Sequence, residues 1–362
     1  MGLRLRFAAA AVVLFGAIAV PGSAWAACPA QWTIIPSPSP GDPSLLTSVA
    51  AGRERNVWAV GSYDFRRSLA IRWDGERWKN VALTNPFDED ELNTVAHIPR
   101  SDRFIAAGRH GGEKIPTQTF ILKGVHGEWR YSPRSDRPGN LYGAAARNSK
   151  DAWLVGHRSL HGAGPHPTAL HRTGDRWRRV DVPQAKSGGF LTDVDAVPRA
   201  RQAWAVGTTT GGFPYTFRWR NGAWEDVQNT FANVYTLNAV EAVAWNNVWV
   251  AGWRLVGAID AETFIAHWNG SGWKVSPTGT GHPGVVESLA AVDAKDIWAV
   301  GDIWAGDSDF LHWDGSTWQE VPVTIPGGGS LNDISTVPGS RTLWAVGKRS
   351  GGRTLTMRLC GS

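Results

Sequence analysis

The sequence predicts an all-β fold, a seven-bladed β-propeller with four antiparallel strands in each blade. The first observation is a Val-Gly-like step that recurs seven times between Gly61 and Gly347, about every 48 residues. The second is that each period holds four short runs of β-branched or aromatic residues bounded by turn residues. The third is composition: 42 Gly and 21 Pro leave little room for long helices, and 42% hydrophobic residues exclude a disordered chain.

The N-terminal segment has the pattern of a secretory signal. Arg4 and Arg6 precede an uncharged apolar run from residue 7 to residue 20, and Ala24-Trp25-Ala26 fits a small-x-small cleavage site. The run is short for a membrane span. We therefore expect residues 1–26 to be removed and residues 27–362 to form one exported propeller domain. The protein would be secreted or extracellular, or periplasmic in a Gram-negative cell.

The strands of one copy follow a fixed order. A first run has the form Leu-x-x-Val, as at 46–49, and a second has the form Trp-Ala-Val-Gly, as at 58–61. A third ends in Trp-Asp-Gly at 73–75, and a fourth begins at Trp78. Asp-Gly and Asn-Gly favour the positive φ of a tight hairpin turn between strands three and four. Four antiparallel strands repeated without helices are typical of a propeller blade.

The Trp residues support this assignment. Of 21 Trp, 17 fall into the Val-Gly column, the Asp-Gly column or the start of a fourth strand. We expect these columns to pack between the blades as apolar cement. Trp25 leaves with the signal, and the repeat does not account for Trp245, Trp253 and Trp304.

The two ends of the chain are predicted to close the ring together. The last copy lacks a fourth strand, and Trp32 to Ile35 matches the fourth strand that begins at Trp78. The N-terminal strand should therefore complete the last blade. Cys28 and Cys360 both align with the turn between strands three and four, so we predict a Cys28–Cys360 disulfide in place of that turn.

The Trp-x-Val-Gly and Trp-[Asp/Asn]-Gly-x-x-Trp repeats resemble those of secreted bacterial β-propellers, grouped loosely with kelch and galactose-oxidase-like propellers. The resemblance covers all seven copies and implies the fold. It leaves the activity open, because that superfamily includes binding modules, enzymes and scaffolds. The copper chemistry of galactose oxidase needs a Tyr cross-linked to Cys, and the only Cys residues here flank the ring closure. We expect no cofactor.

The predicted binding site lies on the face that carries the loops between strands two and three, where propellers usually bind ligands. Trp253 and Trp304 open these loops in blades five and six, and carboxylates accompany them. An aromatic platform beside carboxylates suits a sugar. The alternative is that each indole folds back as a lid on the core. The predicted ligand-binding residues are Trp253, Trp304, Asp260, Glu262, Asp302, Asp307, Asp309 and Glu287.

The same loops are basic in blade seven and blades one to three, so we expect one side of this face to be basic and the other acidic. The alternative is a solvated surface with accidental clustering. The basic residues are Arg66, Arg67, Arg109, His110, Lys114, Arg158, Lys348, Arg349 and Arg353.

Metal and catalytic alternatives stay open but are not assigned. His157, His161 and His166 share one loop, and the acids of blade six are possible calcium ligands. A hydrolase with paired carboxylates would use groups lining the channel. The channel candidates are Asp193, Asp195 and Glu241, whereas His171, His267 and His312 occupy one repeat column and are interpreted as structural.

The function predicted from the sequence is a secreted binding module for a glycan or another cell-wall or extracellular polymer. The alternatives are a hydrolase or lyase acting on a polysaccharide in the channel mouth, and an extracellular protein-interaction scaffold. We expect a monomer without a membrane span. The basic residues lack interleaved aromatic residues, which argues against nucleic acid as the partner.

Overall fold

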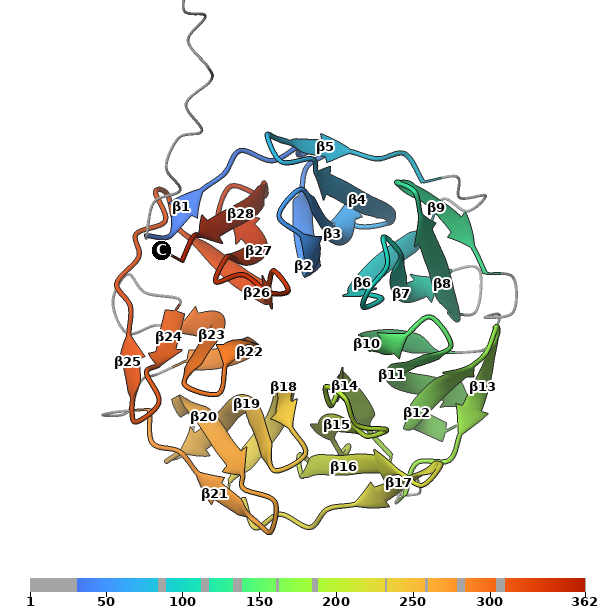
Figure 1. Cartoon of the computed structure of the whole chain (residues 1–362), viewed down its shortest axis with the longest axis vertical. Helices are drawn as coiled ribbons and strands as arrows, with labels where there is room; N and C mark the ends of the chain where they lie inside the picture. The colour runs from blue at the N-terminus through green and yellow to red at the C-terminus, as the bar shows by residue number, and fades with distance from the viewer. Residues whose placement is uncertain are drawn as a thin grey trace, which may run out of the picture.

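The computed structural model describes residues 31–83, 89–111, 117–132, 139–160, 163–183, 188–231, 233–257, 260–278, 284–303 and 310–361. These residues form seven four-stranded antiparallel sheets around a central channel, which confirms the predicted seven-bladed propeller (Figure 1). No helix in these ranges is long and apolar enough to cross a membrane.

The blades use the strands in chain order from the channel outward. Blades one to four comprise β2 (Ser44–Arg53), β3 (Asn56–Tyr63), β4 (Arg67–Trp73), β5 (Trp78–Asn80); β6 (Asp90–His97), β7 (Phe104–His110), β8 (Gln118–Val125), β9 (Glu128–Tyr131); β10 (Asn140–Asn148), β11 (Asp151–Leu160), β12 (Ala163–Thr173), β13 (Arg176–Val180); and β14 (Phe190–Ala196), β15 (Ala203–Thr208), β16 (Pro214–Arg220), β17 (Ala223–Asp226). Blades five to seven comprise β18 (Val234–Ala244), β19 (Asn247–Val256), β20 (Asp260–Trp268), β21 (Trp273–Val275); β22 (Gly284–Asp293), β23 (Asp296–Ile303), β24 (Phe310–Trp313), β25 (Trp318–Glu320); and β26 (Gly329–Thr336), β27 (Leu343–Arg349), β28 (Thr354–Leu359) with β1 (Thr33–Ile34).

The Gly of the Val-Gly step has a steric cause. A Cβ on Gly61 would lie 2.1 Å from the backbone oxygen of Leu45, and a Cβ on Gly347 would lie 2.0 Å from that of Ser330. In all seven blades the innermost strand also carries a β-bulge opposite this step. Only glycine admits the close approach, so the recurring motif marks a bulge that faces the channel.

The Trp columns form the contacts between blades. Trp58 of blade one packs against Phe104 and Trp129 of blade two, with ring centroids 6.2 and 5.0 Å away. Trp344 of blade seven contacts Trp73 and Trp78 of blade one, at 4.9 and 5.0 Å. Every apolar cluster therefore spans two neighbouring blades, as the columns predicted.

The His column is structural, as interpreted. His171 stacks on Trp153 with centroids 5.0 Å apart, and its Nε2 lies 2.8 Å from Asp151. His312 stacks on Trp298 at 4.4 Å and contacts Asp296 at 2.9 Å. Arg358 occupies the same place over Trp344. His171 and His312 thus cover the indole and bind the start of the second strand, whereas Arg358 covers the indole and binds Glu54 of the first blade.

The N-terminal strand closes the ring. β1 pairs with β28, Thr33 opposite Arg358 and Ile34 opposite Met357, and lies beside the C-terminal strands in Figure 1. Cys360 follows β28 and is buried at 5% exposure. Cys28 lies outside the described residues, so the disulfide stays a prediction.

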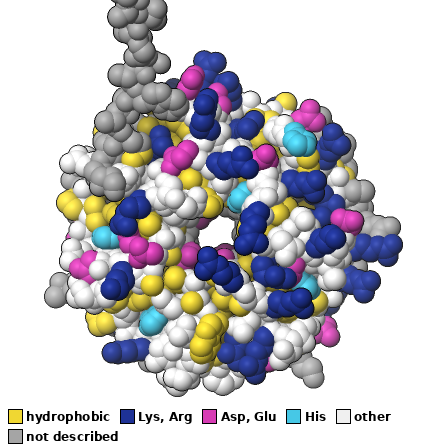
Figure 2. All heavy atoms as spheres, in the orientation of Figure 1, with side chains coloured by type: hydrophobic (Ala, Val, Ile, Leu, Met, Phe, Trp, Pro, Cys, Tyr) yellow, Lys and Arg dark blue, Asp and Glu magenta, His cyan; other side chains and the backbone are white. Residues whose placement is uncertain are grey.

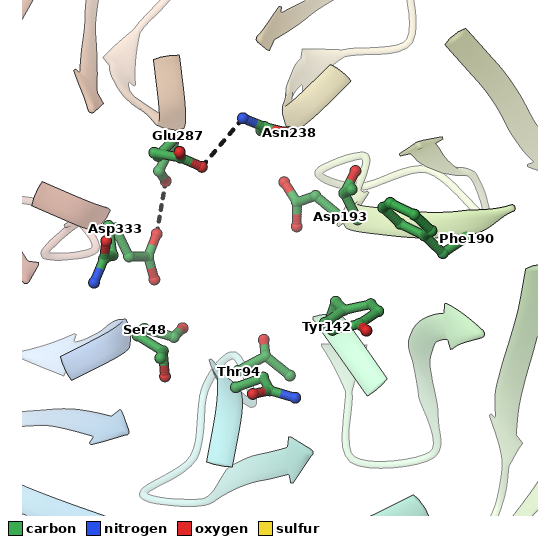
Figure 3. Close-up of a pocket in the computed structure, with 13 residues that line it drawn as sticks. Ser48, Thr94, Tyr142, Phe190, Asp193, Asn238, Glu287 and Asp333 are labelled. Carbon is green, nitrogen blue, oxygen red and sulfur yellow. Dashed lines mark hydrogen bonds between the residues drawn. The ribbon is translucent and has the colours of Figure 1, made fainter. Parts of the chain in front are cut away.

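Because the four strands alternate in direction, the ring has two distinct faces. The turns between the first and second strands and between the third and fourth lie on one face, here called the turn face. The loops between the second and third strands and the connections between blades lie on the other, the pocket face. Figures 1 and 2 view the turn face, and Figure 3 views the ring from the opposite side.

Candidate functional site at the channel mouth

The bulges place one ring of side chains at the mouth of the channel on the pocket face. In five blades the bulged residue is Thr or Asn, and its side chain donates a hydrogen bond to a main-chain carbonyl of the next blade at 2.6 to 3.1 Å. Blades three and six depart from this pattern, because they carry a phenol and a carboxylate. The seven bulge residues are Thr47, Asn93, Tyr142, Thr192, Asn238, Glu287 and Asn332.

In four blades the residue after the bulge accepts a hydrogen bond from a main-chain N–H group; these residues are Ser48, Asp193, Ser288 and Asp333. Asp193 Oδ2 accepts from the main-chain N–H of Val240 in the next blade at 2.9 Å. Asp333 Oδ2 accepts from Val49 N–H at 2.7 Å and joins the last blade to the first. Each pair ties neighbouring first strands together across the channel wall. We call these carboxylates blade staples.

The bulge residues and several of the residues after them line a cavity of about 260 Å³ at the mouth of the channel. Tyr142 and Phe190 lie on one side of it, with ring centroids 6.1 Å apart, and Glu287 and Asp333 lie on the other (Figure 3). Asn238 Nδ2 donates to Glu287 Oε2 at 3.1 Å. The mouth is therefore aromatic on one wall and carboxylate on the opposite wall.

The carboxyl groups of the channel have raised pKa values. Burial, reinforced by the charge of Asp302, raises the pKa of Glu287 to about 7. Burial raises the pKa of Asp193 to about 8, although two main-chain N–H groups oppose the shift, and raises the pKa of Asp333. Deeper in the channel, burial raises the pKa of Asp195 to about 6. Burial in the narrow channel disfavours the charged forms of these acids, and a bound cation would stabilise the charged forms.

The staples limit what catalysis the mouth can support. A glycosidase of the usual kind needs two carboxyl groups free to act on substrate as acid and base or nucleophile. Asp193, Asp195 and Asp333 instead accept main-chain N–H groups of neighbouring or own strands. Among the described carboxylates of the cavity, Glu287 is the one without such a bond. The geometry therefore favours binding over two-carboxylate hydrolysis.

Glu287 is the residue of the predicted site that lies in this cavity. Trp253 lies elsewhere on the pocket face and stacks on Tyr235, with centroids 4.7 Å apart and planes at 29°. The prediction that Trp253, Asp260 and Glu262 lie in a loop was wrong, because strand pairing continues as far as Val256 opposite Asp260. Glu262 is also engaged, by Arg254 Nε at 2.7 Å.

The prediction that Asp302 lies in a loop was also wrong, because it is the exposed penultimate residue of β23 and pairs with Val285. Trp304, Asp307 and Asp309 lie outside the described residues. Sequence reasoning missed the exposed aromatic residues of blades four and five, Phe213 at 70% and Tyr235 at 48% exposure.

On the predicted basic side of the pocket face, Arg66, Arg109 and His110 are paired with acids. Arg109 forms a two-pronged contact with Glu91 at 2.6 and 2.8 Å, and Arg66 contacts Glu89 at 3.0 Å. The partners are acids in the connections between blades or at the starts of first strands, outside the loops between the second and third strands. Lys114 lies outside the described residues.

The histidine loop shows no metal geometry in what the structure describes. β11 and β12 extend almost to their turn, so His166 pairs with Arg158 in a regular hairpin. Across the described ranges, no three His, Cys, Asp or Glu side chains are arranged to hold a metal ion. His161 is not among the described residues.

Tyr142, Phe190, Asn238 and Asp333 were missed as pocket residues. A signal for two of the bulge positions was present in the repeat, since Tyr142 and Glu287 are the two members of their column that are neither Thr nor Asn. Phe190 and Asp333 carry no comparable signal, because whether they face the cavity depends on how seven first strands meet.

The fold resembles known propellers, while no protein-family model and no curated protein matches the sequence. YCF48 from Cyanidioschyzon merolae is similar with a TM-score of 0.62 and 18% identity over 90% of this chain and 98% of that one. YCF48 bound to a D1 peptide gives 0.59 and 16%, covering 93% and 100%. The β-propeller domain of Cps50 (Swd1) from Myceliophteria thermophila gives 0.56 and 12%, covering 91% and 100%. At these identities the likeness shows the propeller fold alone.

Proposed function

We propose that this protein is an exported binding scaffold that receives a cationic side chain of a protein partner in the channel mouth. Arg and Lys combine an apolar stem with a charged head, and the mouth offers an aromatic wall opposite carboxylates. The stem would pack on Tyr142 and Phe190 while the head reaches Glu287. The single observation that carries the proposal is the carboxylate of Glu287 standing where five other blades carry a group that binds the next blade.

The shape of the mouth suits an extended side chain. About 260 Å³ lies at the mouth, and the channel continues past Asp193 and Asp333 into a further 230 Å³. A side chain presented by a larger partner fills such a cavity while the rest of the partner contacts the face around it. The similar YCF48 structure with a D1 peptide supports the idea that a propeller of this shape holds a peptide.

The test uses two small probes that differ only in charge. Titration of N-acetyl-arginine methylamide against the mature protein should show binding at the channel mouth, followed by calorimetry or by indole fluorescence. The citrulline analogue keeps the shape without the charge and should bind about tenfold more weakly or not at all. Glu287→Gln should remove the preference for the charged probe. Equal binding of both probes, or a preference unchanged in the variant, would overturn the proposal.

A second candidate is carbohydrate binding on the stacked pair of Tyr235 and Trp253. The exposed ring of Tyr235 over Trp253 offers a face on which a sugar can stack, with Asp260 exposed nearby on β20. A glycan array probed with the mature protein and with Trp253→Ala tests it. Sugar signals lost in the variant would favour this candidate, and an array without signals would exclude the glycans tested.

Export is part of the same proposal. The signal-like segment before residue 27 supports delivery outside the cytoplasm, where the Cys28–Cys360 disulfide would form. We propose a monomer, because β1 covers the edge of β28 that would otherwise be open to pairing with a second copy. Sequencing the N-terminus of secreted protein and measuring its mass in solution test both statements.

A further inference from the structure

The turn face carries a crescent of positive charge that the proposed function does not use. Figure 2 shows Lys and Arg gathered around the channel opening on the side of blades one to four, with mixed charges on the opposite side. Segments 53–56, 98–104, 147–151 and 197–203 cover the turn-face ends of the first strands of these blades, the turns after them and the first residue of each second strand. Together they hold eight Lys or Arg against three Asp or Glu. The basic crescent consists of Arg53, Arg55, Arg100, Arg103, Arg147, Lys150, Arg199 and Arg201.

The three acids beside the crescent are already paired. Asp102 contacts Arg53 at 3.2 Å, and Asp151 is shared between Arg147 and His171. Glu54 binds Arg358 at 2.8 Å and accepts from a Ser of blade seven. Six exposed cations therefore remain without an ion-pair partner among the described residues: Arg55, Arg100, Arg103, Lys150, Arg199 and Arg201.

Two of these arginines stand where the backbone favours glycine. Blades two, four and seven share one turn, in which the residue after a Pro has positive φ. Blade seven has Gly339 there with φ 76°, whereas blades two and four have Arg100 and Arg199, each with φ 62°. The same closing hydrogen bond at 2.8 to 3.0 Å shows that the three turns are equivalent. Each of these arginines places a charge on the turn face at a position that glycine would occupy with less strain.

The surroundings of the crescent favour a single polymer strand over a flat surface. The outer turns of blades one to three lie on the same face and carry charges of both signs: Glu76, Glu128 and Asp175 are exposed, and so are Arg77 and Arg176. A flat anionic membrane would meet the carboxylates of this rim. A single polymer strand can follow the inner crescent and avoid them.

We propose that the basic crescent binds an anionic polysaccharide whose carboxylate or sulfate groups pair with successive guanidinium groups. Arg predominates over Lys by seven to one in the crescent, and its planar fork suits two-pronged contact with oxyanions. The curved row reaches across four consecutive blades, so it matches repeating charge along a chain better than one isolated anion. This site lies on the face opposite the channel mouth and is independent of the proposed function.

The test measures binding of a heparin dodecasaccharide, used as a defined anionic chain, by calorimetry at several salt concentrations. The double variant Arg100→Gly with Arg199→Gly removes two charges and places Gly where blade seven already has it. We expect at least about tenfold weaker binding, and a slope of log affinity against log salt reduced by about two. The melting temperature should stay equal or rise, because the strain is relieved, which separates lost binding from unfolding.

The matched control removes two charges from the pocket face, Arg349→Gln with Arg353→Gln, and should bind the chain as the native protein does. An equal loss of affinity in both double variants would mean that binding depends only on net charge, and it would overturn the proposal. So would unchanged binding in the crescent variant, or binding to vesicles of phosphatidylglycerol and phosphatidylcholine at least as tight as to the dodecasaccharide. A native protein that binds none of the probes would likewise refute it.

Discussion

A single residue at the bulge decides whether a blade contributes to the ring or to the site. Asn93 and Asn332 each donate to a carbonyl of the next blade, so their amide N–H groups are not available to a ligand. Glu287 occupies the equivalent place but, once ionised, has no proton to donate to the next blade. Its carboxylate is left to the cavity, held by Asn238 alone among the described residues. The same backbone geometry thus yields structural and ligand-facing groups from one substitution.

The pKa of Glu287 predicts a pH-dependent stability difference. Its pKa rises from 4.5 in the unfolded chain to about 7 in the folded one, so the folded state favours the protonated form. The stabilising contribution is complete below about pH 4.5 and is lost as pH rises through about 7. Glu287→Gln stays uncharged and should gain melting temperature relative to the native protein as pH rises from 5 to 8.

Scanning calorimetry of both proteins at steps of half a pH unit checks this prediction. The other channel acids titrate in both proteins, so the difference between the two curves reports on Glu287. Asp302→Asn is the control for its charged neighbour and should shift the midpoint of that difference to lower pH. Parallel curves for the native protein and Glu287→Gln would contradict a raised pKa.

At the scale of the element, the first strands are joined by side chains rather than by ladder hydrogen bonds. The bulge turns successive side chains of one strand toward the backbone of the next. Asp193 accepts from Val240 N–H, and Thr192 donates to the Leu237 carbonyl. One N–H group and one carbonyl of the neighbouring strand therefore have hydrogen-bond partners. Polar residues in the channel wall are therefore part of what holds the blades together.

Removing a blade staple should cost more than removing a surface charge. Asp193→Ala leaves the Val240 N–H without its acceptor in a half-buried place, which typically costs about 1–3 kcal/mol. Asp193→Asn keeps an acceptor oxygen and removes a carboxyl whose burial raises its pKa to about 8, so it should match or exceed the native stability at pH 9. Urea unfolding of both variants, with Glu128→Ala as the exposed control, measures this. Equal destabilisation by Ala and Asn would argue against the staple.

At the scale of the whole molecule, the ring is closed by segments from the two ends of the chain. β1 supplies the outer strand of the last blade, and Trp32 stacks on Phe310 with centroids 4.3 Å apart. Deleting residues 28–35 should expose the edge of β28 and open the aromatic contact with blade six. We expect aggregation or a large fall in melting temperature, measured by light scattering and calorimetry. A truncated monomer with native stability would contradict this closure.

The predicted disulfide can be tested apart from the strand. Cys360→Ser keeps β1 in place and removes only the cross-link. The loop-entropy relation gives an upper figure of roughly 5 kcal/mol for a ring of this length. A peptide mass map without reductant should show the Cys28–Cys360 pair in the exported protein. Two free thiols there would refute the disulfide.

The sequence by itself determined the fold class, the number of blades and the way the ring closes. These follow from local causes that repeat: a Gly required by a close backbone approach, Asp-Gly turns, and Trp columns that pack between neighbours. The sequence also placed Glu287 at the mouth of the channel, because its position at the start of a first strand is a property of the repeat.

The tertiary structure alone decided which side chains share a cavity. Tyr142, Phe190 and Asp333 belong to blades three, four and seven, and only the closed ring brings them around one opening. Trp253 shows that local position can also mislead. It follows the Val-Gly step, which predicts a loop, but the pairing between β19 and β20 continues past Trp253. The basic crescent is likewise assembled from four turns far apart in the chain. Repeat periodicity fixes what each blade contains, whereas the convergence of seven blades on one axis determines what they present together.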